Sequence, residues 1–402
     1  MLTVQKYGGS SVADEKRIAN VAARIAECYN EGNQVIVILS AQGDTTDNLI
    51  ELASKVSSRP SAREMDMLIS TGEQQSVALM ALALHEIGIP AVSLNANQIG
   101  MLTTGVHRNA RIKSISSERI YKELENKNVV LIAGFQGYCE AGNITTLGRG
   151  GSDTTAVAVA AAMTADLCEI YTDVDGIYTA DPRLVDDARK LETITYDEML
   201  EMASLGANVL HNRSVELAKN YAVRLVVRSS MTNAPGTLIK EEGSLENTLV
   251  SGITVDKNVA RVSVCEIVDK PGMAFKLFDS LADNGVAVDM ILQSVGRDGT
   301  KDISFTVAKG QREKTLSVLE TRSFDFGYSS YDDSIVKLSI VGVGIATNPK
   351  VASQMFGALY DANVNIDMIS TSEMKLSVLI NEKDLVRGMN SVHERFFKKV
   401  EA

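Results

Sequence analysis

The sequence contains no tryptophan, few other aromatic residues and only four cysteines in 402 residues. The cysteines are scattered, with neither a CxxC pair nor a Cys/His spacing, which argues against a zinc site and against a disulfide framework. No apolar run approaches the roughly 18 residues of a membrane-spanning helix, and no basic and apolar leader precedes the first strand-like segment. We therefore expect a protein of the reduced cytoplasm that does not contact a membrane.

Basic residues are also in deficit, with 40 Lys and Arg against 51 Asp and Glu and a net charge of -11. This balance argues against a general affinity for nucleic acid, although it does not exclude a local nucleotide site. The apolar content of 45% is ordinary for a globular protein, and the length predicts two or three domains.

Strand-like runs alternate with helix-like segments up to about residue 230. We expect strands at 2–7, 34–40, 91–94, 129–133, 167–172 and 224–227, and helices at 14–30, 63–87, 110–125, 153–164, 196–204 and 213–220. This alternation predicts an α/β domain over 1–232, with a mostly parallel open sheet covered on both faces. The stretch 233–248 is rich in residues that break regular structure and is expected to be a linker.

Beyond the linker the chain repeats itself with a constant offset, as at Phe278 and Phe356, Leu281 and Leu359, and Asp289 and Asp367. Each copy has a strand, a proline-containing turn, a helix and a further strand. The repeat predicts two βαβ-type modules, over 249–330 and 331–402. Two copies are too few for a solenoid.

A glycine-rich turn, GRGGSDTTA, places three glycines around Arg149 and opens a helix with Ser152 and Asp153. Helix N-termini carry unpaired N–H donors and partial positive charge, so this turn predicts a phosphate or carboxylate site. Thr172 and Asp173 follow an apolar strand, which is where open α/β sheets bind ligands.

The first strand ends in KYGGSS, with Lys6 before Gly8 and Gly9. Such a turn lets the backbone approach phosphate oxygens, and a neighbouring ammonium can neutralise charge on a transferring phosphoryl group. It is not a Walker A motif, because the lysine precedes the glycines. Taken alone it is more often ordinary loop structure, but the turn around Arg149 in the same domain favours a phosphate site.

Two polar residues leave alternatives open. Thr45 lies on a turn that follows a strand and enters a helix, where capping and ligand binding can coexist. Glu73 lies in an otherwise apolar helical stretch and needs a cation, either a ligand ammonium or a structural partner. His107, Arg108 and Arg111 form either a solvated basic face or part of a site.

KYGGSS, STGE from Ser70, GRGGSD and YTDVDGIYTADPR from Tyr171, in this order, closely resemble the motifs of aspartokinases, which are members of the amino-acid kinase family. The resemblance covers essentially the whole chain, and the C-terminal repeat looks like the paired ACT domains of these enzymes. It implies an amino-acid-kinase-type αβα sandwich followed by two βαββαβ, ferredoxin-like ACT modules. In this family the strand at 249–255 often pairs with the second module, so the two modules are expected to be interleaved.

The implied activity is phosphoryl transfer from ATP, with Mg²⁺, to the β-carboxylate of L-aspartate. The product, 4-phospho-L-aspartate, leads to lysine, threonine and methionine. The residue chemistry agrees, because an acceptor carboxylate is already ionised and catalysis reduces to alignment and charge neutralisation.

The resemblance also implies residue roles, with no metal ligand assigned. Lys6, Gly8, Gly9 and Ser10 would hold phosphates; Thr45, Glu73, Arg149 and Ser152 would hold aspartate; Asp153 would organise Lys6; and Thr172, Asp173, Tyr178, Asp181 and Arg183 would line the nucleotide pocket. Many relatives have lysine at Asn208, so one nucleotide contact is in doubt.

The ACT pair would bind feedback amino acids, lysine or threonine or both, at interfaces between modules, which implies a homo-oligomer that is at least a dimer. The matching positions are Asp269, Gly272, Ala274 and Gln293 in the first copy and Asn363, Ile366, Thr371 and Ser372 in the second. The alternatives are another amino-acid kinase, such as a glutamate kinase, and a non-catalytic amino-acid sensor whose kinase domain has decayed.

Overall fold

The computed structural model describes residues 1–207, 209–241, 249–294, 299–321 and 325–398. The chain divides into two compact units: Met1–Ile177, Lys190–Ala203 and Asn208–Glu246 form the first, and Tyr178–Arg189, Ser204–Ala207 and Asn247–Ala402 form the second. Among the helices of the described residues, none combines the length and apolar character needed to cross a bilayer.

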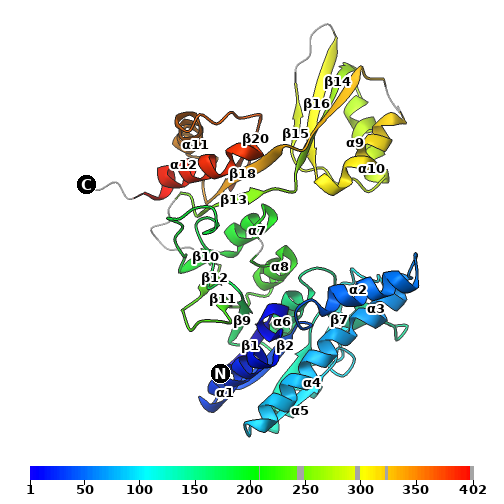
Figure 1. The fold of residues 1–402 in the computed structure, drawn as a ribbon, viewed down its shortest axis with the longest axis vertical. Coiled ribbons are helices and arrows are strands. Elements are labelled where there is room, and N and C mark those ends of the chain that lie inside the picture. Colours follow the sequence, from blue (N-terminus) through cyan, green and yellow to red (C-terminus); the bar gives the residue numbers. More distant parts are fainter. Residues whose placement is uncertain (208, 242–248, 295–298, 322–324, 399–402) are drawn as a thin grey trace. The chain divides into compact units, whose positions relative to one another are not determined.

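An eight-stranded sheet forms the centre of the first unit (Figure 1). Its order is β10-β12-β11-β9-β1-β2-β6-β3, and the neighbouring strands are parallel except for β11 and β12. The strands are β1 (Leu2–Tyr7), β2 (Gln34–Leu39), β3 (Ala91–Leu94), β6 (Val129–Ala133), β9 (Leu167–Thr172), β10 (Thr193–Thr195), β11 (Leu225–Ser229) and β12 (Thr237–Lys240). The mostly parallel sheet expected from the alternating pattern is confirmed.

Helices cover both faces of the central strands. On β2, Val35, Val37 and Leu39 pack in one apolar core with α1 (Glu15–Asn30) and α4 (Thr71–Glu86). Side chains alternate along a strand, so Ile38 faces the other side, where α6 (Gly151–Ala162) packs. Burial on both faces explains the uninterrupted apolar sequences of β2 and β6. The remaining helices of this part are η1 (Gly9–Val12), α2 (Thr45–Val56), α3 (Ala62–Ile69), α5 (Glu118–Glu125), α7 (Tyr196–Ser204) and α8 (Asn212–Asn220).

Two predicted helices differ from the structure. The helix expected at 63–87 is broken at Ser70 into α3 and α4, and the Ser70 carbonyl there accepts a hydrogen bond from Gln136 Nε2 at 2.9 Å. The helix expected at 110–125 begins only with α5. The serine-rich sequence before it has little helix propensity, and β5 (Ile112–Ser114) pairs there with β4 (Leu102–Thr103). Together with β7 (Gln136–Tyr138) and β8 (Ile144–Thr146) they form a small second sheet.

The expected linker 233–248 contributes a strand to the main sheet, so its assignment as a plain connection was wrong for Thr237–Lys240. This segment is β12, and Thr237 and Ile239 are both buried in it. Alternating burial along TLIK explains why it pairs between β10 and β11. Residues 242–248 lie outside the described residues.

The second unit contains two four-stranded antiparallel sheets (Figure 1). The first module has the order β15-β16-β14-β17 and consists of β14 (Ala260–Val268), α9 (Met273–Asp283), β15 (Ile291–Gln293), β16 (Thr300–Val307), η2 (Lys309–Gln311), α10 (Arg312–Glu320) and β17 (Tyr328–Asp332). The second has the order β13-β18-β20-β19 and consists of β13 (Gly252–Asp256), β18 (Ile335–Val341), α11 (Pro349–Asp361), β19 (Met368–Thr371), β20 (Lys375–Asn381), η3 (Glu382–Asp384) and α12 (Leu385–Phe397). The expected ferredoxin-like modules are confirmed.

The two modules are interleaved in sequence. The strand expected at 249–255 is β13, and it pairs with β18 although the whole first module separates the two strands along the chain. Within its sheet β13 occupies the edge position that β17 occupies in the first module. The first module is therefore an insertion within the second.

Candidate active site

The loops that follow β1, β2 and β9 meet at the carboxyl edge of the main sheet. Gly8 N donates to Tyr171 O at 3.3 Å, and Gly43 N donates to Gly9 O at 3.0 Å. A Cβ on Gly9 would lie 2.6 Å from Ala41 O, so a side chain cannot be accommodated there. The glycines of the first turn thus let three loops approach one another closely.

Lys6 and Asp153 form an ion pair at this edge. Lys6 Nζ, from β1, lies 2.6 Å from Asp153 Oδ1, in the first turn of α6, and both side chains are close to 90% buried. Lys6 thus lies against the helix that Arg149 precedes. The pair keeps a buried ammonium beside the glycine turn, because a buried charge without a partner is costly.

The N-terminus of α6 is shaped by glycine. Its N-cap residue, Gly150, has a left-handed backbone with φ 65° and provides no capping side chain. A Cβ on Gly150 would lie 2.2 Å from His211 Cβ, so only glycine fits. Next to it, Ser152 packs against Gly134, which follows β6 at the same sheet edge. A helix N-terminus without a capping side chain is suited to an anionic ligand.

Glu73 is a buried carboxylate in the first turn of α4. Its Oε1 accepts a hydrogen bond from Ala41 N at 3.3 Å, whereas the buried Oε2 has no hydrogen-bond partner among the described residues. Burial raises the pKa of Glu73 to about 7, and the backbone hydrogen bonds oppose this only in part. No ion pair to Glu73 occurs within the described ranges, so the structural cation partner considered above is absent there.

Two further predicted residues lie on turns next to these groups. Arg149 is exposed between Gly148 and Gly150, and it forms no ion pair with any described residue. Thr45 begins α2, and its methyl group would lie 3.4 Å from a Cβ on Gly72, the residue before Glu73. The Arg149 side chain is thus exposed, whereas Thr45 is half-buried beside the start of α4.

The predicted nucleotide residues fall into two groups. Thr172, whose hydroxyl donates to Asp173 Oδ1 at 2.9 Å, belongs to the first unit. Tyr178, Asp181 and Arg183 belong to the second unit, so they do not share a unit with Lys6. Arg183 pairs with Asp181 at 2.8 Å, and this hydrogen-bonded guanidinium lowers the pKa of the Asp181 carboxyl.

The segment that carries Tyr178, Asp181 and Arg183 is fixed within the second unit. Ile253 N of β13 donates to Thr179 O at 2.7 Å, and Thr179 Oγ1 lies 2.9 Å from His393 Nε2 of α12. Asn390 of α12 also donates to Leu184 O at 2.9 Å. A segment that the sequence assigned to the first domain is thus hydrogen-bonded to strand β13 and helix α12 of the second module. Asn208, which raised the doubt about one nucleotide contact, lies outside the described residues.

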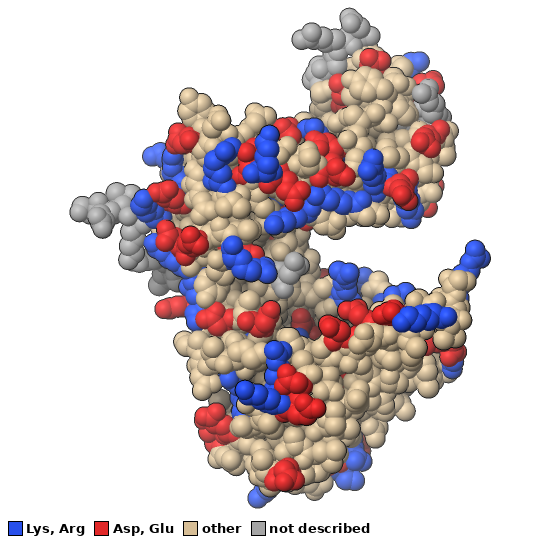
Figure 2. All heavy atoms as spheres, in the orientation of Figure 1, with Lys and Arg blue, Asp and Glu red and all other residues tan. Residues whose placement is uncertain are grey.

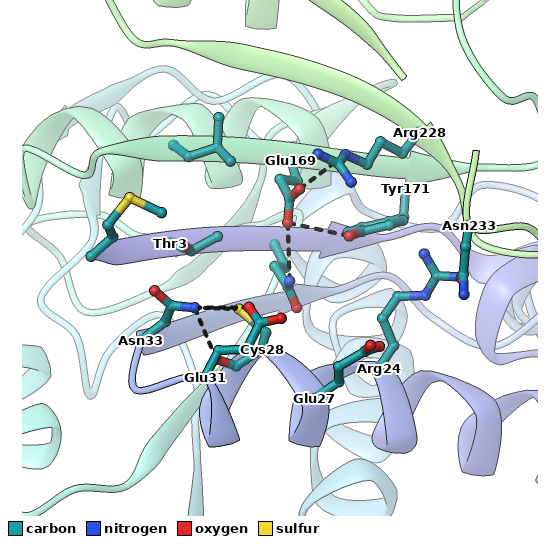
Figure 3. A pocket seen from close by; sticks show the side chains of 13 residues that line it. Thr3, Arg24, Glu27, Cys28, Glu31, Asn33, Glu169, Tyr171, Arg228 and Asn233 are labelled. Carbon is teal, nitrogen blue, oxygen red and sulfur yellow. Dashed lines mark hydrogen bonds and ion pairs between the residues drawn. The ribbon is translucent and has the colours of Figure 1, made fainter. Parts of the chain in front are cut away.

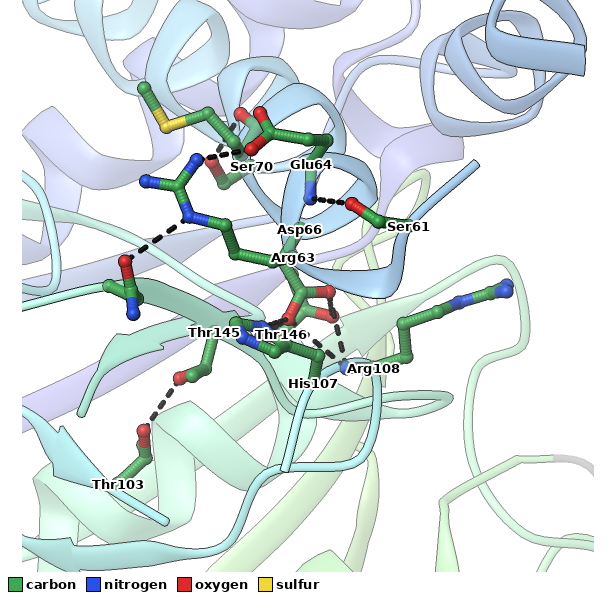
Figure 4. Close-up of polar contacts among 12 residues, drawn as sticks. Ser61, Arg63, Glu64, Asp66, Ser70, Thr103, His107, Arg108, Thr145 and Thr146 are labelled. Carbon is green, nitrogen blue, oxygen red and sulfur yellow. Dashed lines mark hydrogen bonds and ion pairs between the residues drawn. The ribbon is translucent and has the colours of Figure 1, made fainter. Parts of the chain in front are cut away.

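Sequence reasoning missed Asp66, a fully buried carboxylate on α3 (Figure 4). It accepts hydrogen bonds from Arg108 N and from Thr146, and His107 Nδ1 lies 2.7 Å from its Oδ2. His107 is therefore held by a carboxylate and is not part of a freely solvated basic face. The available signal was an acidic residue beside Met65 on the apolar side of an amphipathic helix.

A cavity of about 320 Å³ lies beside α1 and over β1 and β9, and none of the predicted site residues lines it (Figure 3). Its central group is Glu169, which accepts from Gln5 Nε2 at 3.0 Å and from the Tyr171 hydroxyl at 3.2 Å. Arg228 Nε lies 3.0 Å from the other Glu169 oxygen. The Glu169 carboxylate is thus held by a glutamine, a tyrosine and an arginine of the protein itself.

A smaller cavity, of about 180 Å³, lies at the start of α9 in the first module. The four predicted effector positions of this copy line it together: Asp269, Gly272, Ala274 and Gln293. Lys301 also lines it and pairs with Asp269 at 2.8 Å. The pocket thus offers a carboxylate, an ammonium and the N-terminus of a helix whose N-cap is a glycine.

The corresponding positions of the second copy are more open. Asn363 has φ 51° just after α11, and its carbonyl accepts from Arg387 at 3.2 Å. Ile366 packs against the core of the module, and Thr371 and Ser372 are exposed at the end of β19. Asparagine tolerates a left-handed backbone, so Asn363 has a local structural role at the helix end.

Charged side chains of both signs are interspersed over the face shown in Figure 2. Among the described residues, no three or more His, Cys, Asp and Glu side chains form a group that could hold a metal ion.

Comparison with known proteins identifies the class of protein first. The model of the amino acid kinase family matches residues 1–229, and that of the ACT domain matches 264–322 and 338–396. The sheet edge with its glycine turns therefore belongs to an amino acid kinase domain, which is followed by two ACT domains.

Individual relatives identify the group within the amino acid kinase family. The chain is 48% identical to the aspartokinase of Mycolicibacterium smegmatis over 403 residues, covering 98% of this chain and 96% of the relative. Escherichia coli aspartokinase III in complex with aspartate and ADP matches it with a TM-score of 0.83 at 25% identity, covering 99% of this chain and 100% of that one. The same enzyme in complex with lysine and aspartate gives a TM-score of 0.80 at 25% identity and the same coverage. The chain belongs to the aspartokinases, as its motifs predicted, and is thus a phosphotransferase with a carboxyl group as acceptor.

Proposed function

We propose that this chain transfers the γ-phosphoryl group of ATP to the β-carboxylate of L-aspartate and so forms 4-phospho-L-aspartate. The observation that carries the proposal is Glu73, a buried carboxylate with an unpaired oxygen at the sheet edge that also carries the Lys6–Asp153 pair. A carboxylate held in this way is matched to the ammonium of an amino acid. The E. coli enzyme solved with aspartate and ADP supports the choice of both substrates.

In this proposal, one set of residues binds the phosphates of ATP and another set binds aspartate. Lys6, Gly8, Gly9 and Ser10 hold the phosphates, and the Lys6 ammonium offsets charge as the phosphoryl group moves. Glu73 binds the substrate ammonium, and Arg149 binds a carboxylate through two parallel N–H donors. Thr45 and Ser152 add hydroxyl groups beside them. No general base is needed, because the acceptor carboxylate is ionised at neutral pH.

The nucleotide and its metal fit the chain's residues. The glycine-capped N-terminus of α6 and the turn after β1 supply N–H groups for phosphate oxygens, and Thr172 and Asp173 extend this edge toward the nucleoside. The resemblance also assigns Tyr178, Asp181 and Arg183 to the nucleotide; these residues belong to the second unit, and their role stays a prediction. Mg²⁺ often binds through substrate phosphates, water and one or two carboxylates, so it needs no dedicated protein cage. Asp153 would be such a carboxylate, and a bound Mg²⁺ would neutralise charge on the phosphates.

We further propose that the enzyme serves the synthesis of lysine, threonine and methionine and is inhibited by lysine, threonine or both. The pocket around Asp269, Gly272, Ala274 and Gln293 supports an amino-acid effector, because it offers donors for a carboxylate and an acceptor for an ammonium. Asn363, Ile366, Thr371 and Ser372 are the corresponding groups of the second copy. The relative solved with lysine supports lysine as one effector.

A homo-oligomer, at least a dimer, is part of the same proposal. The edge strands β15 and β19 expose Ile291 and Ile369, which suits pairing between modules of two chains. Sedimentation of the purified chain with and without lysine measures this. A monomer under both conditions would remove the dimer from the proposal.

The catalytic proposal is tested with the purified chain, MgATP and hydroxylamine, which traps an acyl phosphate as a hydroxamate. We expect product with L-aspartate and little with L-glutamate; turnover of glutamate but not aspartate would replace our assignment. For the effector, lysine and threonine are added singly and together in thermal unfolding, since a ligand of the folded state raises its stability. Asp269→Ala should abolish the shift, whereas Asp279→Ala, an exposed residue of α9, should retain it.

A further inference from the structure

Asp66 is the most completely satisfied buried carboxylate of the α3 region, and its hydrogen-bond donors come from distant segments (Figure 4). His107 Nδ1 lies 2.7 Å from Oδ2, and Arg108 N donates to both oxygens at 3.1 and 3.2 Å. Thr146 donates twice, from N at 3.2 Å and from Oγ1 at 2.7 Å. The single carboxylate of Asp66 on α3 thus accepts from Arg108 on a loop and from Thr146, the last residue of β8.

The loop that carries Arg108 and the end of β8 hold the main chain that leads to Arg149. Thr146 O accepts from Ala110 N at 2.9 Å, which ties the two segments together. Arg108 O lies 2.9 Å from the position of a Cβ on Gly148, so the carbonyl packs directly against the residue before Arg149. The Arg149 guanidinium has no ion pair of its own within the described ranges, and its place depends on this backbone.

Asp66 is also linked through the main chain to the start of α4, which carries Glu73. Ser70 N donates to the carbonyl of Asp66 at 3.1 Å, and Ser70 marks the break at which α4 begins. Glu73 lies in the first turn of α4. Asp66 therefore joins the helix pair that carries Glu73 to the loop that carries Arg149.

We propose that Asp66 is a positioning residue for the phosphotransfer, setting the distance between Glu73 and Arg149 and thereby the recognition of the amino-acid substrate. It does not touch the substrate itself. The inference rests on the proposed roles of Glu73 and Arg149. A purely structural carboxylate would affect stability and both substrates alike, whereas a positioning carboxylate acts on the acceptor.

The test compares three variants of the full chain by steady-state kinetics. Asp66→Asn keeps the shape but turns an N–H toward groups that are themselves donors, and Thr146→Val removes one hydroxyl from the network and keeps the Thr146 N–H. Ser61→Ala removes the N-cap of the same helix, where Ser61 Oγ accepts from Glu64 N, and leaves the Asp66 contacts in place. It is the matched control for a general loss of helix stability.

We expect Asp66→Asn and Thr146→Val to raise the KM for aspartate about tenfold or more, with less than a roughly twofold change in the KM for ATP. Ser61→Ala should change neither. Thermal unfolding identifies any variant that fails to fold, and Thr146→Val then carries the test. Equal changes in both KM values, or a lowered unfolding temperature without a kinetic change, would overturn the inference.

A double-mutant cycle shows whether Asp66 acts through Arg149. In an Arg149→Ala background, Asp66→Asn should lower kcat/KM for aspartate by much less than it does alone, since coupled residues are not additive. Fully additive losses would contradict the proposal. If the unaltered chain failed to phosphorylate aspartate, the proposed function would fall, whereas additivity in an active enzyme would remove only the role of Asp66.

Discussion

The buried carboxylate of Glu73 predicts that aspartate binding depends on pH near neutrality. Burial raises the pKa of Glu73 to about 7, so about half of the ligand-free enzyme carries a neutral Glu73 at that pH. An ammonium binds only to the ionised form. The ionised fraction is roughly one tenth at pH 6 and roughly nine tenths at pH 8, so kcat/KM for aspartate should fall about tenfold as the pH is lowered from 8 to 6.

The matched perturbation is Glu73→Gln, which keeps the size of the side chain and cannot ionise. Loss of a charged hydrogen bond to the substrate ammonium costs about 1.5 to 3 kcal/mol, so kcat/KM for aspartate should fall by roughly 10- to 150-fold at pH 8. The pH dependence that belongs to Glu73 should vanish with it. The assay is hydroxamate formation at low aspartate and saturating MgATP from pH 6 to 8. Identical pH profiles for the two proteins would refute the reasoning.

The same group predicts an opposite effect on stability. The pKa of Glu73 is about 7 in the folded chain and near its ordinary value of 4.5 in the unfolded one, so the folded state binds the proton more tightly. The stability associated with this proton is complete below about pH 4.5 and is lost as the pH rises through about 7, a change of about 3 kcal/mol. Glu73→Gln should escape this loss and be more stable than the unaltered chain at pH 8. Denaturant unfolding without ligands at pH 8 measures the difference, and a less stable variant would contradict the buried, unpaired state of Glu73.

Three further predictions follow from single contacts. Gly150→Ala should lower the unfolding temperature by the equivalent of about 1 to 3 kcal/mol, because φ is 65° and the new Cβ would lie 2.2 Å from His211 Cβ. Calorimetry measures this, and an unfolding temperature equal to that of the unaltered chain would count against this geometry. Lys6→Met should reduce turnover by at least about 100-fold while Lys16→Met, at an exposed lysine of α1, keeps it; an active Lys6 variant would remove Lys6 from the mechanism. Burial and a neighbouring arginine lower the pKa of His393, so the folded chain binds that proton less tightly and stability should fall as the pH drops below about 6.5; thermal unfolding at pH 7 and 5 should show this component, and His393→Gln should lack it.

The sequence predicted the parts of the site that follow from strand ends and glycine turns. Lys6, Gly8 and Thr172 each follow or end an apolar strand, and parallel strands bring their carboxyl ends to one edge. The pairing of Lys6 with Asp153 follows the same logic, since α6 covers the central strands. Local patterns were sufficient to bring these residues to one sheet edge, because they lie at the boundaries of regular elements.

Other features depend on contacts between distant segments, which no local pattern records. Asp66 is defined by Arg108 and Thr146, and its own helix gives no sign of them. The break between α3 and α4 at Ser70 involves a hydrogen bond from Gln136, and strand β12 forms by pairing with β10 and β11. The helix expected over 110–125 was too long because pairing with another strand overrode a weak helical pattern.

The interleaving of the ACT modules has a consequence for synthesis on the ribosome. β13 emerges before any residue of the first module, yet Gly252 pairs with Val341, so this strand must wait until the inserted module has been translated. The inserted module can close first on its own neighbouring strands, while β13 keeps an unpaired edge in the nascent chain. A stop codon placed after β17 would release a protein with one finished module and a strand without its sheet. Translation of the segment that contains β18 therefore determines whether β13 is incorporated into its sheet or stays exposed to aggregation.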